Sequence, residues 1–490
     1  MTAEAYFFTS FLPHEPPEGE VGGVTGGTAP AVLVEAKTNH EYASRIIGSL
    51  SNHSYPPETQ SILDAPKPHS EFCPPVDGLE RLSYDLPRDT YGNVEQVWDM
   101  AQRYMADEQW VNAHLQARIR PGKHIIFDHH TLGMYLGSEL ASALPNRSNY
   151  LIGVRAHSQF LALTKYDRPD YYQTRYEGAL GTQFMRDAQM EALRYADFTI
   201  VPTEIERIMT IEALVAQEVL TREQAESKIM TVGIPLDLSN FTPDDNEGTK
   251  RMYEIATVNE HIRQRTSQSE SVGFIGSLLD PDANYISYVG RLDFEKRPWE
   301  LAEAYASYLQ ENWSQRGNFA RLLMIGGLTN KPGAAERHAQ MIIMLKGLPT
   351  ELQEYFTITG FPIPHENSVH ISAIEIYPSA EEAFNISEKQ KRATGGLVAL
   401  SPVVGHIGTN IRNTRGATDT ALWVEPTPDW KSFTHIFEAA RNPQQYQEIA
   451  RAGYRHVQQF RAFEVMRDLI GKLDSTFPGF FQNGRFDKLY

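Results

Sequence analysis

The sequence predicts an α/β protein with two Rossmann-like domains facing a central cleft. Short runs of β-forming residues alternate with helical patterns along the chain, which is typical of parallel sheets. The 490 residues suffice for two or three domains, and they contain no internal repeat or low-complexity tract. Ligands of such sheets bind beyond the carboxyl ends of the strands, so we expect the functional site in the cleft between the domains.

The first domain is expected over residues 1–245. Helical spacing from Ala29 to about Leu50 predicts a helix after a loop with paired glycines, GGVTGG (22–27). The stretch 51–95, rich in Pro, Ser and His, is predicted to be an extended excursion outside the core. The predicted strands are YFFTSF (6–11), HIIFDHH (124–130), YLIGVRAH (150–157), the end of MEALRYADFTIVPT (190–203) and KIMTVGIPLD (228–237).

A polar segment and a second domain follow. Residues 246–283 are interpreted as an interdomain linker with an insertion that holds one helix (249–265). The second domain is expected over residues 284–460, and the tail 461–490 is expected to pack back on the first domain. The predicted strands of the second domain are ISYVGRL (286–292), FARLLMIGGL (319–328), YFTITGF (355–361), AIEIYPS (373–379), LVALSP (397–402) and ALWVEP (421–426).

Charge and composition restrict the functional class. The net charge of −17 comes from 45 basic and 62 acidic residues, without a Lys/Arg block, which disfavours a general nucleic-acid binder. No stretch approaches the roughly 18 apolar residues of a membrane-spanning helix, and the N-terminus lacks the pattern of a signal peptide. The single cysteine, Cys73, cannot form an internal disulfide, which suits a reducing compartment. We therefore expect a cytoplasmic protein without an integral membrane segment.

The most informative segment is YVGRLDFEKRPWELAEAYASYL (288–309). A strand ends at Gly290, Arg291 and Lys296 follow five residues apart, and a helix is predicted to begin near Pro298. Two cations and a helix N-terminus at one strand end suit a diphosphate, whose negative charge must be stabilised when its bond to a sugar breaks. Taken alone, the segment fits a solvated charge cluster at a strand-to-helix turn equally well.

The second segment is IYPSAEEAFNISEKQKRATGGLVALSP (376–402). A strand ends at Pro378 and Ser379, Glu381 and Glu382 follow, and AFN is predicted to open a helix. A carboxylate in this position can accept hydrogen bonds from sugar hydroxyls. Taken alone, acidic capping of the helix N-terminus is the better interpretation.

Together, the two segments resemble the C-terminal half of glycosyltransferase family 4 (glycosyltransferase group 1), retaining enzymes of the GT-B superfamily. YVGRLDFEK, LLMIGG and PSAEEAFNISEKQKRATGG match three successive motifs of that family over about residues 284–460. The N-terminal half resembles it more weakly, through GGVTGG, VRAHSQF (154–160), LRYADFTIVPTEIER (193–207) and KIMTVGIPLDLSNFTP (228–243), which occur in the family's order.

The resemblance implies a role for each matching residue. Arg291 and Lys296 would hold the donor diphosphate, Glu382 would contact the donor sugar, and His157 would approach that sugar from the first domain. These four are the expected catalytic residues. The expected donor-binding set is Gly23, Gly290, Arg291, Lys296, Gly326, Phe384, Asn385, Ile386 and Gln390.

The chain departs from the family at several of these positions. The second glutamate of the family's E-x7-E pattern, which contacts the ribose, is replaced by Gln390. Glutamine can still accept a hydrogen bond from a ribose hydroxyl, although more weakly than a carboxylate. Ala383 and Asn385 stand where glycines are common, and Arg297 replaces the glycine after the lysine. These changes indicate an unusual donor, an unusual acceptor or lost activity.

Three further candidates carry less weight. Asp128, His129 and His130 have metal-ligand residue types, but at a strand end they are interpreted as an acceptor-side or structural cluster. Asp280-Pro-Asp282 resembles a D-x-D metal motif, yet its turn context favours a structural role. The run YDRPDYYQTRY (166–176) fits either a sugar-stacking surface or a packed loop. No metal site and no cofactor are therefore predicted, apart from the nucleotide-sugar co-substrate.

The resemblance implies a metal-independent, hexosyltransferase-type enzyme that moves a sugar from a nucleotide-diphosphate sugar to a small-molecule or glycoside acceptor. It implies retention by front-face substitution, because the sequence offers no evident carboxylate pair for double displacement. Two alternatives stay open: a trehalose-phosphate-synthase-like or pseudo-glycosyltransferase on the same fold, and a catalytically inactive GT-B subunit that binds or regulates a partner. The base, the sugar, the acceptor and the oligomeric state are not determined by the sequence.

Overall fold

The computed structural model describes most of the chain from residue 193 onward, together with residue 190 and five earlier strands. For the first four strands it describes the backbone alone, and for the fifth it adds the side chains of residues 151–155. The continuous described ranges are 193–244, 248–267, 274–315, 319–328, 333–380, 382, 384–410, 419–424 and 430–478. The chain divides into two compact units, residues 1–237 with 460–490, and residues 238–459.

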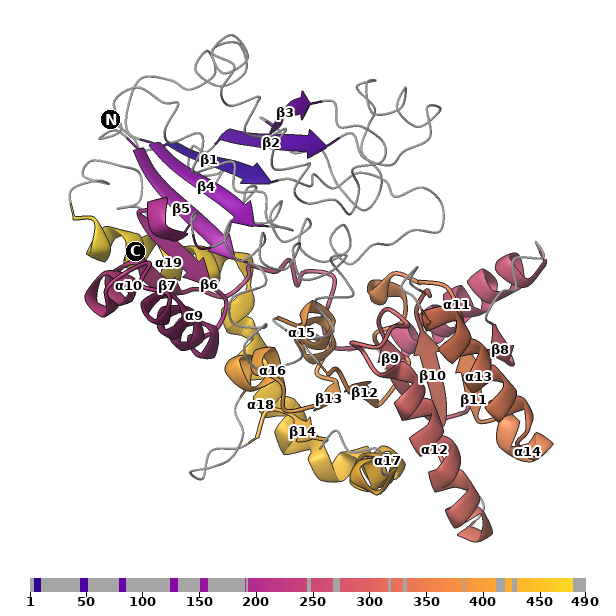
Figure 1. The fold of residues 1–490 in the computed structure, drawn as a ribbon. Helices are drawn as coiled ribbons and strands as arrows, with labels where there is room; N and C mark the ends of the chain where they lie inside the picture. Colours follow the sequence, from indigo (N-terminus) through magenta and orange to yellow (C-terminus); the bar gives the residue numbers. More distant parts are fainter. Residues whose placement is uncertain are drawn as a thin grey trace. The chain divides into compact units, whose positions relative to one another are not determined.

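The first unit contains a seven-stranded sheet in the order β3-β2-β1-β4-β5-β6-β7 (Figure 1). Every neighbouring pair is parallel, as the alternation of strands and helices predicts. The strands are β1 (Glu4–Thr9), β2 (Arg45–Ser51), β3 (Leu79–Tyr84), β4 (His124–His130), β5 (Tyr150–Ala156), β6 (Phe198–Val201) and β7 (Ile229–Thr231).

Two predictions for the first domain are wrong. The end of the helix predicted from Ala29 to about Leu50 is strand β2, where the β-branched pair Ile46 and Ile47 favours extended backbone over helix. The stretch 51–95 is not wholly an excursion, because it contributes β3, an edge strand of the sheet that is paired along its whole length with β2. Leu79 and Leu82 give this short segment apolar side chains, but the many Pro and Ser residues around it made the whole stretch look like a loop in the sequence.

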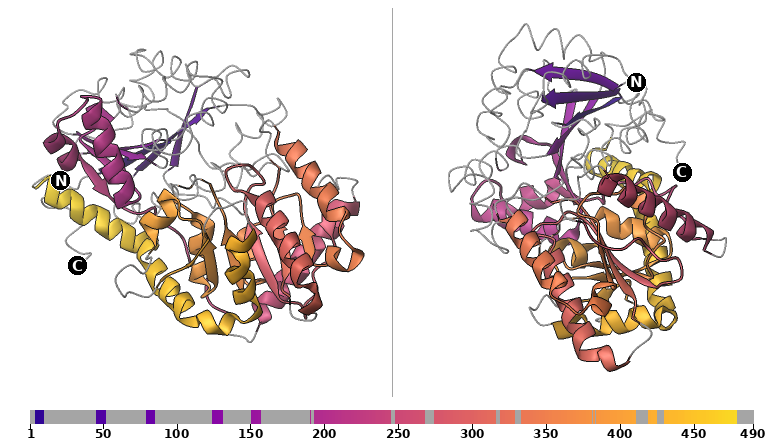
Figure 2. Two further views of the ribbon diagram at one scale, coloured as in Figure 1. Left: turned by 60° about the horizontal axis from the view of Figure 1, so that its bottom comes forward. Right: turned by 90° about the vertical axis from the view of Figure 1, so that its right-hand side faces the viewer.

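Within the described ranges, the first unit includes the helices α9 (Glu204–Ala216), α10 (Arg222–Lys228) and the C-terminal α19 (Ala462–Thr476). The backbone N–H of Leu236 donates to the carbonyl of Phe460 at 2.9 Å, and Nζ of Lys472 on α19 donates to the carbonyl of Thr231 at 2.6 Å. Figure 2 shows α19, in yellow, beside the magenta helices of this unit. The last helix is thus part of the first unit.

Six strands of the second unit repeat the order of the first six strands of the first unit. The sheet of the second unit runs β14-β13-β12-β9-β10-β11-β8, and only the short β8 is antiparallel to its neighbour. Counted from β9, this order is the 3-2-1-4-5-6 arrangement of a Rossmann fold, as in the first unit. The predicted strands are confirmed as β9 (Tyr285–Val289), β10 (Arg321–Ile325), β11 (Phe356–Ile358), β12 (Ile374–Tyr377), β13 (Leu397–Leu400) and β14 (Leu422–Trp423), to which the structure adds β8 (Ile275–Gly276).

The segment predicted to be an interdomain linker, 246–283, belongs to the second unit instead. Its helix α11 (Thr249–Ser267) buries one face, with Ile255, Val258 and Ile262 packed in a cluster with Tyr285 and Leu323 of the sheet. The polar composition of the segment reflects the solvent-facing side of an amphipathic helix rather than a connection between domains.

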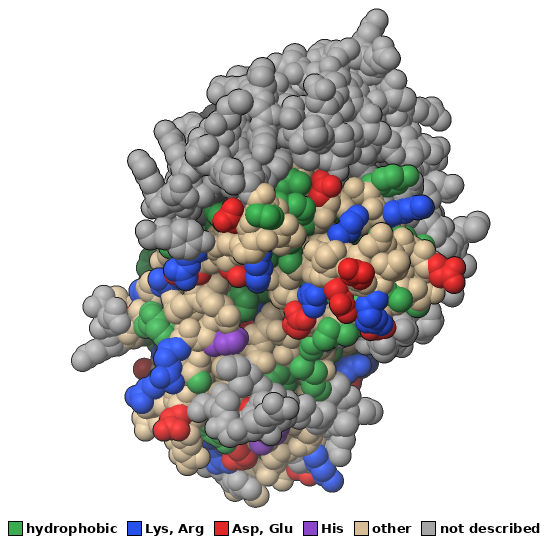
Figure 3. All heavy atoms as spheres, turned by 90° about the vertical axis from the view of Figure 1, so that its left-hand side faces the viewer, with side chains coloured by type: hydrophobic (Ala, Val, Ile, Leu, Met, Phe, Trp, Pro, Cys, Tyr) green, Lys and Arg blue, Asp and Glu red, His purple; other side chains and the backbone are tan. Residues whose placement is uncertain are grey.

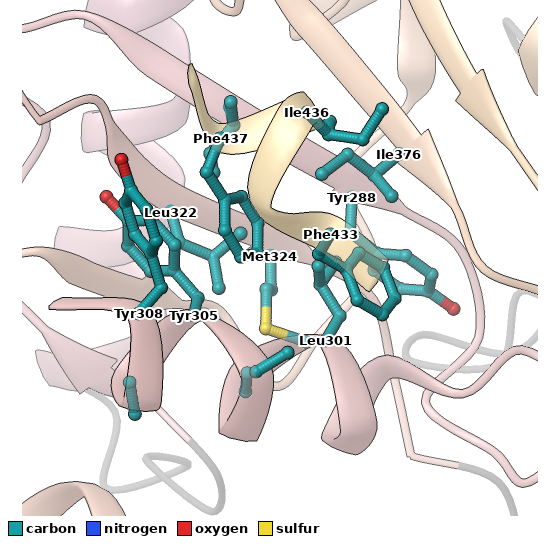
Figure 4. Close-up of a cluster of buried hydrophobic side chains, with 14 of the residues drawn as sticks. Tyr288, Leu301, Tyr305, Tyr308, Leu322, Met324, Ile376, Phe433, Ile436 and Phe437 are labelled. Atoms are coloured by element: carbon teal, nitrogen blue, oxygen red, sulfur yellow. The ribbon is translucent and has the colours of Figure 1, made fainter. Parts of the chain in front are cut away.

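The main core of the second unit combines aliphatic side chains with a group of packed aromatic rings. Tyr305 on α12 packs edge-on against Phe437 on α17, with ring centroids 5.0 Å apart, and Met324 of β10 lies in the same cluster (Figure 4). The helices of this unit are α11, α12 (Pro298–Asn312), α13 (Ala334–Lys346), α14 (Thr350–Gln353), α15 (Ile386–Ala393), α16 (Val404–Thr409), α17 (Thr434–Arg441) and α18 (Gln447–Val457). Short 3-10 turns occur at η5 (Trp313–Gln315), η6 (His365–Asn367), η7 (Trp430–Phe433), η8 (Pro443–Tyr446) and η9 (Gln458–Phe460).

The described surface carries charges of both signs. On the face drawn in Figure 3, acidic and basic side chains are interspersed. Within the described ranges, no helix combines the length and the apolar character that crossing a bilayer would require.

Candidate active site

The candidate site lies at the carboxyl ends of β9 and β12. These two strands are neighbours in the sheet although β10 and β11 separate them in sequence, so the strand order reverses between them. Connections from such a pair leave toward opposite sides and open a crevice, where α/β proteins bind their ligands. The two sequence motifs, Gly290–Lys296 after β9 and Ser379–Ile386 after β12, therefore meet at one place in the sheet.

Glycine at position 326 is required by packing. A Cβ atom on Gly326 would lie 1.9 Å from the carbonyl oxygen of Gly290, so the ends of β9 and β10 approach too closely for any side chain. The backbone N–H of Gly290 donates to the carbonyl of Ile325 at 3.0 Å, and the N–H of Leu292 to the carbonyl of Gly327 at 2.9 Å. The glycines thus set the path of the loop that carries the two cations.

The Arg291 guanidinium is held by two carboxylates of its own loop. Its two terminal nitrogens lie 3.1 Å from Oδ2 of Asp293 and 2.8 Å from Oε2 of Glu295. Asp293 is fully buried and also accepts the backbone N–H of Lys296 at 3.1 Å, whereas the Arg291 side chain stays 30% exposed. The loop therefore orients Arg291 and still leaves it accessible to an anion.

Lys296 and Glu382 join the two motifs directly. Nζ of Lys296 lies 2.5 Å from Oε2 of Glu382, with side chains 20% and 13% exposed. Burial alone would raise the pKa of Glu382, but the Lys296 charge and hydrogen bond, aided by the His406 and Lys389 side chains, lower it below its ordinary value. Glu382 is therefore an ionised hydrogen-bond acceptor.

Asn385 begins the helix after Glu382. Its side-chain oxygen accepts the backbone N–H of Glu388 at 3.1 Å, which makes Asn385 the N-cap of α15. Its amide nitrogen lies 3.2 Å from Nε2 of the buried His406, whose Nδ1 lies 2.8 Å from the carbonyl of Ser401. Burial lowers the pKa of His406 to about 4, so the ring is neutral at pH 7 and accepts the Asn385 amide. The first-turn amides of α15, including that of Ile386, have no acceptor within the helix.

Two residues that differ from the motifs the sequence resembles are described by the structure. Arg297 has φ 51° and ψ 41° and caps α12 in the left-handed conformation that glycine adopts without strain. Gln390 is half-buried, and its Oε1 lies 2.9 Å from Nδ1 of His365. In both places the backbone and the neighbours accommodate the substitution.

Helix α15 also buries a charged cluster. The Glu388 carboxylate lies 2.6 Å from Nζ of Lys389 and 2.7 Å from Nε of Arg392, and all three side chains are at most 2% exposed. Nζ of Lys389 also donates to Oγ1 of Thr409 at 3.0 Å and lies 4.2 Å from the centroid of the Phe384 ring. The aromatic ring of Phe384 is therefore committed to packing, and only its backbone amide is available to a ligand.

The remaining predicted residues lie in the first unit. Gly23 and His157 fall outside the described residues. Asp128, His129 and His130 end strand β4, in register with Val154, Arg155 and Ala156 of β5, so their backbones lie at the carboxyl edge of the sheet. Their side chains are outside what the structure describes.

Several residues of the site were not predicted. Asp293 and Glu295 fall within the GRLDFEK motif but look like solvated charges in the sequence. His406 and His365 lie 24 and 17 residues from Glu382 along the chain, and only the folded sheet brings them to α15. The sequence held one signal for Glu295, its position next to the key lysine.

Among the described residues, no group of three or more His, Cys, Asp or Glu side chains has the arrangement of a metal site. A groove of about 700 Å³ in the first unit runs along β7, α9 and α19. Its cations have partners: Nε of Arg207 donates to the carbonyl of Ile229 at 2.7 Å, and Lys472 pairs with Asp468 at 2.7 Å. We assign it no ligand.

Comparison with known proteins identifies the fold. No protein-family model and no curated protein sequence matches this chain. Solved structures do match: HepE of Anabaena in complex with UDP and glucose has a TM-score of 0.58 at 14% identity, covering 96% of this chain and 100% of that one. Sucrose-phosphate synthase of Thermosynechococcus elongatus has a TM-score of 0.60 at 17% identity, covering 96% and 99%.

Trehalose-6-phosphate synthase OtsA is a third match, with a TM-score of 0.63 at 13% identity, covering 96% of this chain and 99% of that one. All three are GT-B glycosyltransferases. The chain therefore has the GT-B fold, with two Rossmann-like domains, as the sequence predicts. At these identities the likeness establishes the fold and not the reaction.

Proposed function

We propose that this protein is a retaining glycosyltransferase of the family 4 type, which transfers a hexosyl group from a nucleotide-diphosphate sugar to a small soluble acceptor. The observation that carries the proposal is the Lys296–Glu382 contact between the β9 and β12 loops, with Arg291 on the same loop as Lys296. A cation and an ionised carboxylate side by side fit the two ends of such a donor, its diphosphate and its sugar hydroxyls.

The reaction follows from these charges. The bond between sugar C1 and the diphosphate oxygen breaks, and Arg291 and Lys296 stabilise the negative charge that develops on the leaving oxygen. A bond forms between C1 and the acceptor oxygen on the same face, and the acceptor hydroxyl proton passes to the leaving phosphate. Glu382 orients the sugar through its hydroxyls. His157, placed by resemblance alone, would contact the sugar from the other domain.

Lys296 has to change partner in this scheme. In the structure its amine bonds Glu382, and the two loops together place three carboxylates, Asp293 and Glu295 after β9 and Glu382 after β12, against two cations. The donor brings two negative charges at the diphosphate, so Lys296 turns toward it and releases one Glu382 oxygen for a sugar hydroxyl. The first-turn amides of α15 add positive dipole near the same point.

The donor class draws support from the structural matches. HepE was solved with UDP-glucose as well as with UDP and glucose, and a trehalose-6-phosphate protein from E. coli with UDP-2-fluoroglucose. UDP-glucose is therefore the first donor to test. Two protein cations and a helix N-terminus can provide the countercharge for the diphosphate, so we propose that turnover survives chelation of divalent ions by excess EDTA. We propose a cytoplasmic location because a chain with one cysteine, Cys73, needs no oxidising compartment.

Gln390 favours a second candidate, an inactive GT-B subunit that binds a nucleotide sugar and regulates a partner. A neutral amide at this position weakens the contact to the ribose, which a binding subunit tolerates better than an enzyme. The other open alternative, a trehalose-phosphate-synthase-like or pseudo-glycosyltransferase, shares the donor site and differs in the product bond.

A thermal-shift screen with UDP, GDP, ADP and their glucose conjugates tests the proposal, because a ligand of the native state raises the melting temperature. We expect one nucleotide and its sugar to stabilise the protein, and Lys296→Ala to abolish the shift. Donor hydrolysis then separates enzyme from binding subunit, and the linkage of the product separates the two enzymes. Absence of any shift with all six ligands would contradict the proposal.

A further inference from the structure

A chain of three hydrogen-bonded side chains leads from the interior of the second unit to Gln390. Nδ1 of His365 lies 2.9 Å from Oε1 of Gln390, and its Nε2 lies 3.1 Å and 3.2 Å from the two carboxylate oxygens of Glu375. Glu375 on β12 is fully buried and also accepts the hydroxyl of Tyr377. The His365 side chain is 8% exposed, whereas Gln390 reaches the surface of α15.

Both ring nitrogens of His365 face acceptors in this arrangement. A buried carboxylate needs a donor, so Nε2 of His365 carries a proton toward Glu375. With the Gln390 oxygen at Nδ1, this nitrogen also has to donate, so the arrangement corresponds to the imidazolium form of His365. Burial opposes this charge, but the Glu375 carboxylate and the hydrogen bonds to Glu375 and Gln390 outweigh it, so the pKa of His365 is raised above its ordinary value.

The other groups around His365 do not outweigh the Glu375 carboxylate. Lys391 on α15 is the nearby cation that opposes the imidazolium, and its Nζ is held by the carbonyls of Val369 and Ser372 at 2.6 and 2.7 Å. The Phe241 ring lies 6.0 Å from the imidazole ring and adds no charge. Glu375 is therefore the dominant charged partner.

The two ends of an amide differ in what they offer a ligand. While its oxygen is bound by the imidazolium, Gln390 presents only its NH₂ group outward, as a donor. If His365 loses the Nδ1 proton, that nitrogen becomes an acceptor, the amide turns over, and the Gln390 oxygen faces outward instead. The protonation state of His365 thus decides whether Gln390 offers a ligand a hydrogen-bond donor or an acceptor.

We propose that His365 is a positioning residue that makes Gln390 a hydrogen-bond donor to a ribose oxygen of the nucleotide, where a glutamate would act as an acceptor. The proposal rests on the proposed function, because it places the nucleotide of the donor at Gln390. It explains how the chain accommodates glutamine in place of glutamate: the histidine fixes the amide, and the imidazolium strengthens the outward N–H bonds by polarising it.

The coupling can be tested without a nucleotide. Nitrogen NMR of the full-length protein with labelled histidine, assigned with a His365→Gln variant, follows the titration of His365. We expect the pKa of His365 to rise in Gln390→Glu, which adds a negative charge, and to fall in Gln390→Met, which removes the acceptor at similar length. A Gln390→Met protein in which His365 titrates as in wild type would overturn the coupling.

Recognition is tested by calorimetric titration with UDP, GDP and ADP across the same pH range. In wild type we expect the affinity for the preferred nucleotide to fall about three-fold as His365 loses its proton, the scale of weakening one hydrogen bond. The affinity of Gln390→Met should not change with the protonation of His365. Any pH dependence that remains in this variant reports titration of the nucleotide phosphate and is subtracted from the wild-type curve. Identical pH curves for wild type and Gln390→Met would overturn the recognition step. Absence of binding by all three nucleotides would instead contradict the proposed function and leave the NMR result standing.

Discussion

Two groups of charged residues in the second unit differ in their contact with solvent. In the loop after β9, Arg291 and Lys296 are 30% and 20% exposed and are held by carboxylates. In α15, Glu388, Lys389 and Arg392 pair with one another and are at most 2% exposed. An exposed cation can exchange its partner for a ligand at little cost, whereas a buried one cannot. The loop is thus suited to binding, and the helix charges are structural.

The largest effect is expected at Glu388. Glu388→Gln leaves Lys389 and Arg392 buried without a countercharge and should lower the free energy of unfolding by about 3–5 kcal/mol. Urea denaturation measures it. The matched control is Glu260→Gln on α11, because the partner of Glu260, Arg263, is exposed. This variant should lower the free energy of unfolding by less than about 1 kcal/mol. Equal costs for the two variants would remove the distinction between the groups.

Arg291 should show the opposite behaviour. Arg291→Ala removes a charge-stabilising group and should lower turnover with the true donor by about 10²-fold, or about 2.7 kcal/mol. The free energy of unfolding should fall by about 1–2 kcal/mol, less than in Glu388→Gln, because Asp293 and Glu295 are buried but Arg291 itself is partly exposed. Steady-state kinetics and urea denaturation of the same preparation check both numbers. Near-wild-type turnover would show that Arg291 does not face the diphosphate.

His406, which is buried beside α15, should make the stability of the protein depend on pH. Its pKa is about 4 in the folded protein against an ordinary 6.5, so the unfolded chain binds the proton first. Wild type should therefore lose stability from this group as the pH falls from about 6.5 to 4, amounting to about 2 kcal/mol at pH 5. In His406→Gln, which keeps a side-chain amide near Asn385, this part of the acid sensitivity should disappear. Parallel stability curves between pH 7 and 4 would contradict a buried neutral His406.

The smallest effect concerns the backbone of the binding loop. Arg297 and Glu218 are the only non-glycine residues with positive φ in the described ranges. Arg297→Gly should raise the free energy of unfolding by up to about 1 kcal/mol, since glycine adopts this conformation without strain. Glu218→Gly, at the end of α9, is the control for the backbone effect alone. If Arg297→Gly lowers the free energy of unfolding while Glu218→Gly raises it, the Arg297 side chain stabilises the fold by more than its backbone strain costs.

Much of the second unit could be predicted from sequence because its strands are short, apolar and bounded by turns. Pro298 marks the start of α12, and Asn385 in AFN marks that of α15, since both residue types favour the first positions of helices. The two motifs could be expected to meet because parallel strands end at one edge. The family 4 assignment and the roles of the site residues stay predictions, because the structural matches establish the GT-B fold alone.

Other features depend on contacts that no local pattern contains. Strand β3 is a strand because β2 pairs with it, and α11 belongs to the second unit because its apolar face meets the sheet. The partners of Asn385 and Gln390 are histidines from distant segments, His406 and His365. In the sequence a lone histidine carries no sign of its neighbours, so neither ring could be assigned a role before the fold was known.

A crystal structure with UDP-2-fluoroglucose, or with the corresponding analogue of whichever nucleotide stabilises the protein, would show directly which residues bind the donor. We predict Lys296 Nζ and the Arg291 guanidinium within about 3 Å of diphosphate oxygens, the range of charge-assisted hydrogen bonds. We also predict that a Glu382 oxygen accepts a hydrogen bond from a sugar hydroxyl and no longer contacts Lys296. A donor bound elsewhere, or one bound while Lys296 keeps its present contact with Glu382 and touches no phosphate, would contradict this prediction.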